Sequence, residues 1–554
     1  MERRLIAAIL LMIAVAVLPS LFIKSPRRAV PSADSTLARP AATTDTARAQ
    51  LPVKAETARP ETARPTRPAR TAQAAETPAE TVTVATPLAR YTLSSAGATV
   101  TSAELPEYRM FGARRGPAVQ LLRPGDRLLA QQVVVGRDTV RLDSADFAVE
   151  RTDGGATFRA RVGAMDAVVS YSYRNGSDYV LDVAGELDGL GGQGALVLVG
   201  LGNGFVNTEA DSIGNYRSYG AVGRRTEPQG VAFSKVAPGE VSTLDGPFDW
   251  VAVKSKYFIG ALLSPDSTKP GFGGLLLIGE PRTGRFAAQA QTWATLPVGP
   301  DGRFRYSLYL GPQEYRHLRK VGREIDKASP YGWIFKPIVM PVAVWITQLL
   351  LWMHQTMTLA YGWVLILFGI AIRLALWPLN QKAMKSSVAM QAVQPLMKDI
   401  QTRFKDDPQR LQQEMLKLYK EHNVNPFGSC LPMLLPFPIL LALFFVFANT
   451  IAFRGVSFLW LPDLSLRDPT YVIPVVMGAS MWALSKLGQM GMPPNPQTKM
   501  MTTVMPIMMT VLFLNFASGL NLYYAVSNLV SLPQQYLINK ARTREMERRK
   551  GKGA

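Results

Sequence analysis

The chain has 554 residues, a formal net charge of +20 at pH 7, 44 glycines, 40 prolines and one cysteine. This length predicts more than one domain, and the single Cys430 excludes an intramolecular disulfide, so an exported domain must be stabilised by packing alone. The Lys and Arg residues flank long apolar runs and are not interleaved with aromatic platforms, which favours an anionic lipid surface and excludes a specific nucleic-acid reader.

The first segment, residues 1–23, is predicted to be a transmembrane anchor. Arg3 and Arg4 precede an apolar run at 5–19 that continues to Ile23, and about 20 apolar residues cross the hydrocarbon core. The alternative is a signal peptide cleaved near the small residues at 14–16. On either interpretation the following residues are exported.

A linker is predicted between this segment and a folded domain. Residues 24–90 are rich in Pro, Ala, Thr and Arg, and Glu-Thr-Ala-Arg-Pro occurs in tandem at 56–60 and 61–65. Such a composition cannot bury a hydrophobic core, so we expect a disordered, fairly extended tether.

A large antiparallel β domain is predicted for residues 91–325. Polar and apolar residues alternate in short runs, as in Val-Val-Ser-Tyr-Ser-Tyr at 168–173 and Tyr-Val-Leu-Asp-Val at 179–183, and Gly and Asp separate the runs. A period of two is typical of strands that bury one face.

Residues 331–358 contain an apolar stretch at 337–353 that is nearly long enough to span a membrane. Pro341 interrupts this stretch, and tryptophan favours the headgroup level of a bilayer. We therefore predict an interfacial amphipathic helix on the outer surface, with a transmembrane helix as the alternative. The tryptophans are Trp333, Trp345 and Trp352.

Further apolar stretches occur in a core predicted for residues 359–539. They lie at 359–379, 431–448, 471–487, 500–516 and 520–538. Together with the first segment they make six, so the sequence predicts a multi-span α-helical membrane protein with six transmembrane helices and a large exported all-β domain.

The charges of the connecting stretches support six spans. Residues 380–427 hold eight Lys/Arg and five Asp/Glu, residues 485–499 hold two and none, and the tail 540–554 holds seven and two. Six spans place all three basic stretches on the side of Arg3 and Arg4, as the positive-inside rule requires, whereas a seventh span would reverse them. Both termini are therefore predicted to be cytoplasmic.

The stretch 380–427 is predicted to form a cytoplasmic hairpin of two helices. Asp407 suits the N-cap of the second helix and Pro408 its first helical position. The charged outer faces of this hairpin are either solvated or available to a partner near the membrane.

We find no motif for catalysis or for a cofactor. His317, His354 and His422 lack metal-ligand spacing to one another and to Cys430. The chain has neither a Gly-Lys-Ser/Thr phosphate loop nor a Gly-x-Ser-x-Gly elbow. We expect no cofactor, no metal and no enzyme activity, and infer that the protein acts by binding.

Arg373 is the most informative single residue. It lies six residues before the end of the second predicted span, about 9 Å from that end at the helical rise. A charge within a span costs about 2.5 to 3.5 kcal/mol on insertion scales, so Arg373 should meet water or a partner. Its head can snorkel to the nearby surface, or it can line a wet cavity open to the cytoplasm.

Polar side chains recur along one face of the last predicted span. Their offsets of three, seven, ten and fourteen place them on one side of a helix. Such a face should bond other helices or meet the same water as Arg373, because aligned polar groups in lipid are costly. The residues are Asn521, Tyr524, Asn528, Ser531 and Gln535.

Four stretches resemble the YidC family of membrane-protein insertases. They are Asn-Pro-Phe-Gly-Ser-Cys-Leu-Pro at 425–432 with Pro-Ile-Leu-Leu-Ala-Leu at 438–443, Gly-Leu-Asn-Leu-Tyr-Tyr-Ala-Val-Ser-Asn-Leu at 519–529, Asp-Pro-Thr-Tyr at 468–471 and Trp-Val-Ala-Val-Lys-Ser-Lys-Tyr-Phe at 250–258. The resemblance covers the chain except residues 24–90.

The resemblance implies a bacterial inner-membrane insertase whose five-helix core encloses a hydrophilic groove open to the cytoplasm and to lipid. Arg373 matches the family's groove arginine. The resemblance also implies a periplasmic β-supersandwich, and a client whose apolar segment slides along the third and fifth spans. The residues assigned to that slide are Leu440, Phe444, Met505 and Leu512.

The resemblance implies nascent membrane proteins as clients, action alone or beside the Sec translocon, and an approach of the ribosome to the basic tail and the hairpin. The sequence departs from many relatives at Pro436 and Gly369, where polar residues are common. A secondary transporter is the rival interpretation, but inverted repeats and paired ionisable residues, which typify transporters, are missing from the sequence.

Overall fold

The computed structural model describes residues 79–552, apart from residues 114 and 283 and the stretches 174–178, 267–268, 285–287, 329–335, 379–380, 382–392, 423–436 and 491–499. These described residues belong to one compact unit, Ala79–Ala554. The predicted anchor at 1–23 and residues 24–78 of the predicted linker lie outside the described residues.

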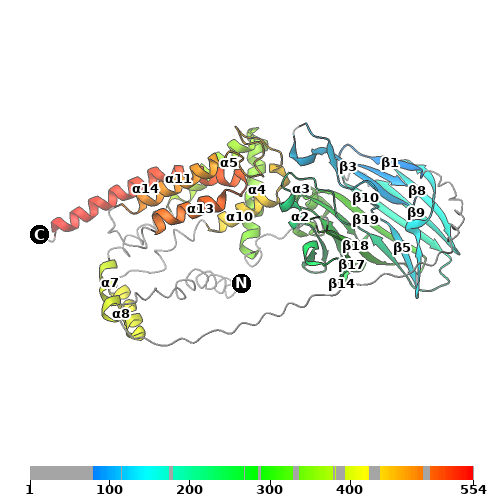
Figure 1. Cartoon of the computed structure of the whole chain (residues 1–554), viewed down its shortest axis with the longest axis horizontal. Helices are drawn as coiled ribbons and strands as arrows, with labels where there is room; N and C mark the ends of the chain where they lie inside the picture. Colours follow the sequence, from blue (N-terminus) through cyan, green and yellow to red (C-terminus); the bar gives the residue numbers. More distant parts are fainter. Residues whose placement is uncertain are drawn as a thin grey trace, which may run out of the picture. The chain divides into compact units, whose positions relative to one another are not determined.

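The first part of the described chain is an antiparallel β domain of three sheets (Figure 1). The four-stranded sheet has the order β1 (Thr81–Ala85), β2 (Arg90–Ser94), β3 (Thr99–Arg109), β4 (Ala118–Gln120). The nine-stranded sheet has the order β13 (Pro228–Ala232), β12 (Gly220–Arg224), β15 (Trp250–Lys254), β16 (Phe258–Leu263), β19 (Arg303–Pro312), β10 (Val180–Asp188), β9 (Met165–Tyr173), β8 (Gly155–Val162), β7 (Ala148–Thr152). The six-stranded sheet has the order β14 (Val241–Phe248), β17 (Phe272–Gly279), β18 (Ala290–Pro297), β11 (Ala195–Gly200), β5 (Gln131–Val135), β6 (Asp138–Arg141).

The alternation of apolar and polar residues determines which face of each strand is buried. In β9 every second residue from Met165 to Tyr171 is buried, and the residues between them are exposed or half-buried. The register pairs Tyr171 with Val183 of β10, and Val183 in turn with Tyr306 of β19. The predicted all-β domain is therefore confirmed, because the period of two gives each strand an apolar face to bury.

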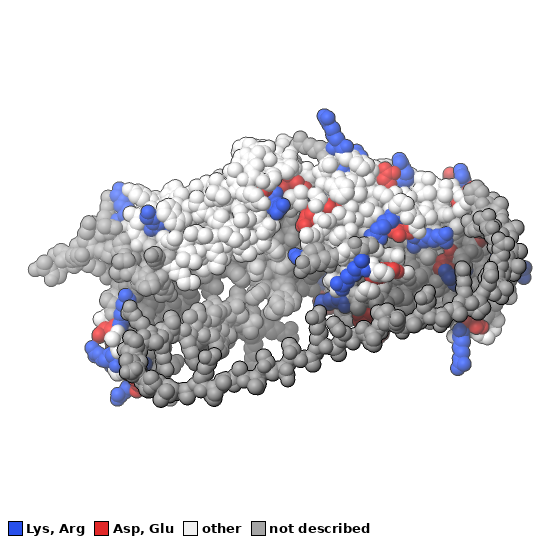
Figure 2. Space-filling model, viewed as in Figure 1, with Lys and Arg blue, Asp and Glu red and all other residues white. Residues whose placement is uncertain are grey.

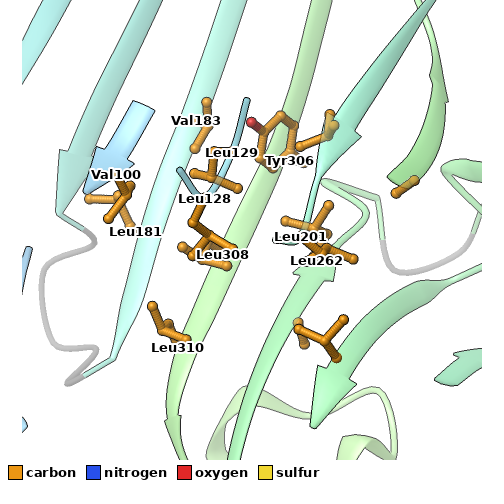
Figure 3. Close-up of a cluster of buried hydrophobic side chains, with 14 of the residues drawn as sticks. Val100, Leu128, Leu129, Leu181, Val183, Leu201, Leu262, Tyr306, Leu308 and Leu310 are labelled. Atoms are coloured by element: carbon orange, nitrogen blue, oxygen red, sulfur yellow. The ribbon is translucent and has the colours of Figure 1, made fainter. Parts of the chain in front are cut away.

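The core of this domain is one cluster that contains residues of all three sheets. Leu181 and Leu308 from the nine-stranded sheet lie in it beside Val100 of β3 and the turn residues Leu128 and Leu129 (Figure 3). All five are essentially inaccessible to solvent. Without a disulfide, burial of these side chains provides the domain's stability.

The boundary predicted between linker and β domain is wrong. Residues 81–90, which we assigned to the disordered linker, form β1, a turn and the start of β2. The Thr-Val-Thr-Val-Ala segment of β1 buries Val82 and Val84 and exposes its other three residues. This alternation outweighs the linker-like composition because β2 supplies a partner strand.

The second part of the described chain is helical. Short α2 (Ser212–Arg217) and α3 (Tyr315–Val321) belong to the β domain. The later helices are α4 (Lys336–Met357), α5 (Tyr361–Ala375), α7 (Gln394–Arg403), α8 (Pro408–Glu421), α10 (Phe437–Asn449), α11 (Val472–Gly488), the π-helix η7 (Met500–Val504), α13 (Met505–Phe513) and α14 (Ser518–Lys552).

Most of these helices pack into one bundle with its own core (Figure 1). Helix α14 lies along α11 and α5, α4 lies along α10, and α13 contacts α11. The visible described surface of this bundle carries little charge, whereas charged residues are frequent over the β domain and over α7 and α8 (Figure 2). Such a distribution suits helices that face lipid.

The number of spans stays a prediction. Among the described residues one helix, Pro337–Met357, is long and apolar enough to cross a membrane. The apolar helices Tyr361–Ala375, Pro438–Asn449, Val472–Gly488 and Thr502–Phe513 have only 10–17 residues each. They coincide with the predicted spans but are shorter than a typical transmembrane helix.

The residues predicted as an interfacial helix form α4. We expected Pro341 to interrupt this stretch, but it lies inside the continuous helix α4. A proline near the start of a helix removes only a single hydrogen bond there. Val339, Ala343, Ile346 and Leu350 are buried in the bundle core. Trp345 and Trp352 are more than half exposed. A two-faced helix suits either an interface or a span, so its placement stays a prediction.

Two helices, α7 and α8, lie in the described part of the stretch predicted as a helical hairpin. Asp407 caps α8 by accepting a hydrogen bond from the Arg410 amide at 3.0 Å, and Pro408 occupies the first turn. Leu418 of α8 is buried beside Val393, with Met397 packed against them. The cytoplasmic location of this pair is not tested by the fold.

We expect Leu308→Ala to lower the thermal midpoint of the detergent-solubilised full chain. The substitution leaves a cavity in a fully buried site, which typically costs about 2 to 5 kcal/mol. Intrinsic fluorescence during heating measures the change. Val241→Ala, at a side chain that is 60% exposed, is the control. Equal midpoints for both variants would contradict the assigned core.

Candidate functional site

The candidate site lies in the helical bundle, where α5 meets α14. Arg373 is in the last turn of α5, and its Nε donates a hydrogen bond to the carbonyl oxygen of Ser527 in α14 at 3.2 Å. That carbonyl also accepts a hydrogen bond from the Ser531 hydroxyl at 2.6 Å. Among the described residues Arg373 has no carboxylate partner. A half-buried cation is therefore held against a helix backbone, with donors left for another acceptor.

The residues of the predicted polar face all lie on α14, but they meet different surroundings. Asn521 is fully buried and donates to the Phe513 carbonyl oxygen at 3.0 Å. Asn528 donates to the Ser480 hydroxyl of α11 at 3.3 Å. Both therefore bond a neighbouring segment, as the helix-packing interpretation expects. This bonding does not test the groove.

Tyr524 also contacts the neighbouring α13, whereas Gln535 bonds within its own helix. The Tyr524 ring packs edge-on against Phe513, with ring centroids 5.5 Å apart. Gln535 donates to the Asn539 side chain at 3.5 Å. Both residues are half-buried, whereas Asn521 and Ser531 of the same face are buried.

Two further polar residues were missed by the sequence analysis. Ser480 is buried in α11 and receives the Asn528 bond. Gln534 is only 6% exposed, and its Nε2 has no hydrogen-bond partner among the described atoms. Its spacing from Ser527 and Ser531 is helical, so a second polar stripe on α14 could have been found. The Ser527 carbonyl could not, because a backbone acceptor leaves no trace in the sequence.

The residues assigned to the client slide differ in exposure. Leu440 and Phe444 of α10 and Met505 of α13 are half-buried, whereas Leu512 is 51% exposed. Leu512 belongs to an exposed apolar face of α13 that also contains Ile507, Met508 and Val511 and continues to Val504 at the end of η7. Water disfavours such a continuous face, and lipid or an apolar guest suits it.

Of the two departures from the family pattern, Gly369 is described and Pro436 is not. Gly369 is buried in α5 against α14, and a Cβ built on it would lie 3.4 Å from a Val526 methyl. This is an ordinary contact, so the position has room for a small side chain. The polarity of the wall at Gly369 is lower than a hydroxylated residue would make it.

One end of the bundle is closed by residues 450–470, the connecting loop between α10 and α11. The fully buried Asp468 accepts hydrogen bonds from the Thr470 amide at 2.9 Å and the Ile473 amide at 2.8 Å. Burial alone would raise the pKa of the Asp468 carboxyl, but these amides and the side chains of Thr470 and Trp460 outweigh burial and hold that pKa below its ordinary value. A charged Asp468 thus anchors the start of α11.

The β domain and the charge-poor bundle, in which Arg373 is half-buried, indicate a membrane protein with a large domain outside the bilayer. Residues 352–546 match the sequence profile of the 60Kd inner membrane protein family, and residues 81–353 match that of the YidC periplasmic domain. The chain is 30% identical over 518 residues to the membrane protein insertase YidC of Chlorobaculum tepidum, covering 86% of this chain and 84% of that protein. The chain therefore belongs to the YidC family.

A second relative agrees with this membership. The YidC insertase of Chlorobaculum parvum is 30% identical over 496 residues, which covers 83% of this chain and 82% of that protein. An active YidC insertase crystal structure with its first transmembrane domain resolved is 18% identical and covers 82% of this chain and 92% of that one, with a TM-score of 0.34. Family membership supports an insertase function, an inner-membrane location and a periplasmic β domain, and the names of these relatives state no catalytic activity.

Asp468→Asn should make the thermal midpoint less sensitive to acid. A carboxylate with a depressed pKa contributes stability that is fully present above the unfolded pKa of about 3.9, and that stability is lost as the pH falls toward the folded pKa. We expect the variant to melt below the unmodified chain at pH 7, and the gap to shrink below about pH 4.

Scans of the full chain in detergent at several pH values measure this gap. Asp399→Asn, on an exposed side chain paired with Arg403, is the matched control and should leave the midpoint nearly unchanged. A gap for Asp468→Asn that grows as the pH falls would contradict the assignment.

Proposed function

We propose that this protein inserts apolar segments of nascent membrane proteins through a positively charged, water-filled groove between α5 and α14. The observation that carries the proposal is Arg373, a cation that bonds the Ser527 carbonyl oxygen and has no carboxylate partner among the residues that the structure describes. An isolated cation in a bundle of apolar helices is costly unless water or a guest meets it. The groove would include Asn521, Tyr524, Asn528, Ser531 and Gln535.

A groove of this kind would lower the barrier for the polar flank of a client. The flank would enter the groove from the cytoplasm and meet Arg373, while the apolar segment would move along the half-buried face of α10 and the exposed face of α13 into lipid. The energy would come from burial of the client's own apolar surface, about 25 cal/mol per Å². No nucleotide is needed for such a step.

The proposal includes a topology of six transmembrane helices with both termini in the cytoplasm. The net basic stretches 380–427, 485–499 and 540–554 support it through the positive-inside rule. Helix α4 would lie at the outer interface with its exposed tryptophans at the headgroups. The connecting loop would then be on the periplasmic side.

We also propose the Sec translocon and the ribosome as partners of this chain. The net basic tail at 540–554 and the charged outer faces of α7 and α8 would lie where a ribosome presents its nascent chain. Arg403 and Asp399, for example, are exposed on α7. Cytoplasmic basic residues would also contact anionic lipid.

Arg373→Ala should abolish most of the insertion activity. A hydrogen bond to a charged group is worth about 1.5 to 3 kcal/mol, so we expect insertion to fall about tenfold or more. Arg373→Lys keeps the charge and should retain part of the activity. The assay reconstitutes the full chain into liposomes and measures protease protection of a short single-span client.

Arg303→Ala removes an exposed arginine of the β domain and serves as the matched control. It should insert the client at the unmodified rate. Full insertion by Arg373→Ala, at equal amounts of folded protein, would mean that Arg373 only extends its head group to the membrane surface. That result would contradict the proposed groove.

Single cysteines on a Cys430→Ser background test the topology. Leu459→Cys, at a connecting-loop side chain that is 69% exposed, should react with a membrane-impermeant maleimide added to intact spheroplasts. Ala554→Cys should react only after lysis. Labelling of Ala554→Cys in intact spheroplasts would rule out a cytoplasmic C-terminus and an even number of spans.

A further inference from the structure

The connecting loop, residues 450–470, is unusually buried for a segment without long helices or strands. Ile451 is 4% exposed and belongs to the hydrophobic core of the β domain. Phe453, Leu461 and Leu464 belong to the core of the helical bundle. Loops normally run over the surface, so a loop with side chains in two cores physically joins the β domain to the bundle.

An ion pair at this junction is shielded from water. The Arg454 Nε lies 2.8 Å from the Glu209 carboxylate, and the two side chains are only 3% and 6% exposed. The Arg454 guanidinium also donates to the Thr208 carbonyl oxygen at 2.8 Å and lies over the Phe258 ring, 5.7 Å from its centroid. Arg454 comes from the connecting loop and the other three residues from the β domain, so the pair crosses the junction.

The acceptors of this pair are themselves fixed by the β domain. The Thr208 carbonyl that accepts from Arg454 also accepts from the Phe111 amide at 2.8 Å. The Thr208 hydroxyl donates to Glu209 at 2.7 Å. An arginine that finds planar acceptors already in place loses little freedom on binding.

Two glycines bring the backbones into direct contact beside the ion pair. Gly112 of the β domain and Gly455 of the loop both have positive φ angles, +65° and +69°. A Cβ built on Gly455 would lie 2.6 Å from the Gly112 carbonyl oxygen. Any side chain at Gly455 would therefore push the loop away from the β domain.

The same loop also holds the first turn of α14. Asp463 accepts from the Gly455 amide at 2.8 Å, and its own carbonyl accepts from the Ser518 hydroxyl at 3.1 Å. The Ser518 amide donates to Leu466 at 2.6 Å and the Gly519 amide to Leu464 at 3.0 Å. A continuous chain of bonds thus leads from Glu209 to the helix that carries the proposed groove residues.

We propose that the Arg454–Glu209 ion pair makes the β domain a closure for the outer end of the groove: it fixes the connecting loop over the start of α14 while a client enters from the other side. This inference rests on the proposed function for its direction, and on the contacts above for its existence. Arg454 and Glu209 are positioning residues, because they act on the client through the loop and α14. Removal of one partner leaves a buried charge unpaired, so the loop should detach from the β domain.

Labelling of a buried reporter tests the closure. Ser518→Cys, on the Cys430→Ser background, introduces a thiol at a position that is fully buried beneath the loop. In intact spheroplasts an impermeant maleimide should label it slowly in the otherwise unmodified chain. Glu209→Gln or Arg454→Gln should raise the labelling rate about tenfold or more, which corresponds to about 1.4 kcal/mol lost from the closed state.

Two further variants separate a specific pair from general damage. The exchanged pair Glu209→Arg with Arg454→Glu should return the labelling rate toward the unmodified value. Arg303→Gln breaks the exposed pair with Glu186 in the same domain and should leave the rate unchanged. Gly455→Val opens the neighbouring backbone contact without touching a charge, and should also raise labelling.

Client insertion into liposomes gives the functional readout for the same variants. Glu209→Gln should slow insertion, and the exchanged pair should restore it. Unchanged labelling in both single variants would overturn the closure, and so would increased labelling without any recovery in the exchanged pair. If the unmodified chain fails to insert the client while labelling responds as stated, the proposed function fails and the closure remains.

Discussion

A cation among apolar helices is the constraint on which the rest of this structure depends. Arg373 is bonded to the Ser527 carbonyl and lacks a carboxylate among the described residues. A charge in a dry interior is costly, so water, a guest or the nearby membrane surface should meet the guanidinium of Arg373. The polar side chains of α14 place further hydrogen-bonding groups on the same helix.

The β domain and the helical bundle both bury a core, but the β domain is surrounded by water and the bundle by lipid. The β domain closes its strands around a single apolar core without any disulfide, and most of its charged side chains lie at the surface. The bundle turns apolar faces outward, on α13 above all, and keeps its polar side chains between helices. The connecting loop contributes to both cores, so the domain and the bundle are joined by packing as well as by the chain.

Features that depend on residues close in the sequence could be predicted. Alternation placed the strands, and the polar residue and proline at Asp407 and Pro408 placed the start of α8, because caps and strand faces depend on residues close in sequence. The linker boundary was wrong for the opposite reason. Residues 81–90 have a linker's composition, and pairing with β2 and β3 makes them strands. Likewise, Pro341 lies inside α4 because neighbouring turns and α10 support that helix.

The sequence by itself determined that apolar helices follow an exported all-β domain, that one arginine lies within them, and that the last helix has a polar face. Periodicity and charge balance carry that information. Only the tertiary structure decided that Arg373 meets the Ser527 backbone, that Asn528 bonds Ser480, and that Arg454 pairs with Glu209 across 245 positions of sequence. A backbone acceptor and a distant partner leave no local pattern, because the contact exists only once packing has brought the segments together.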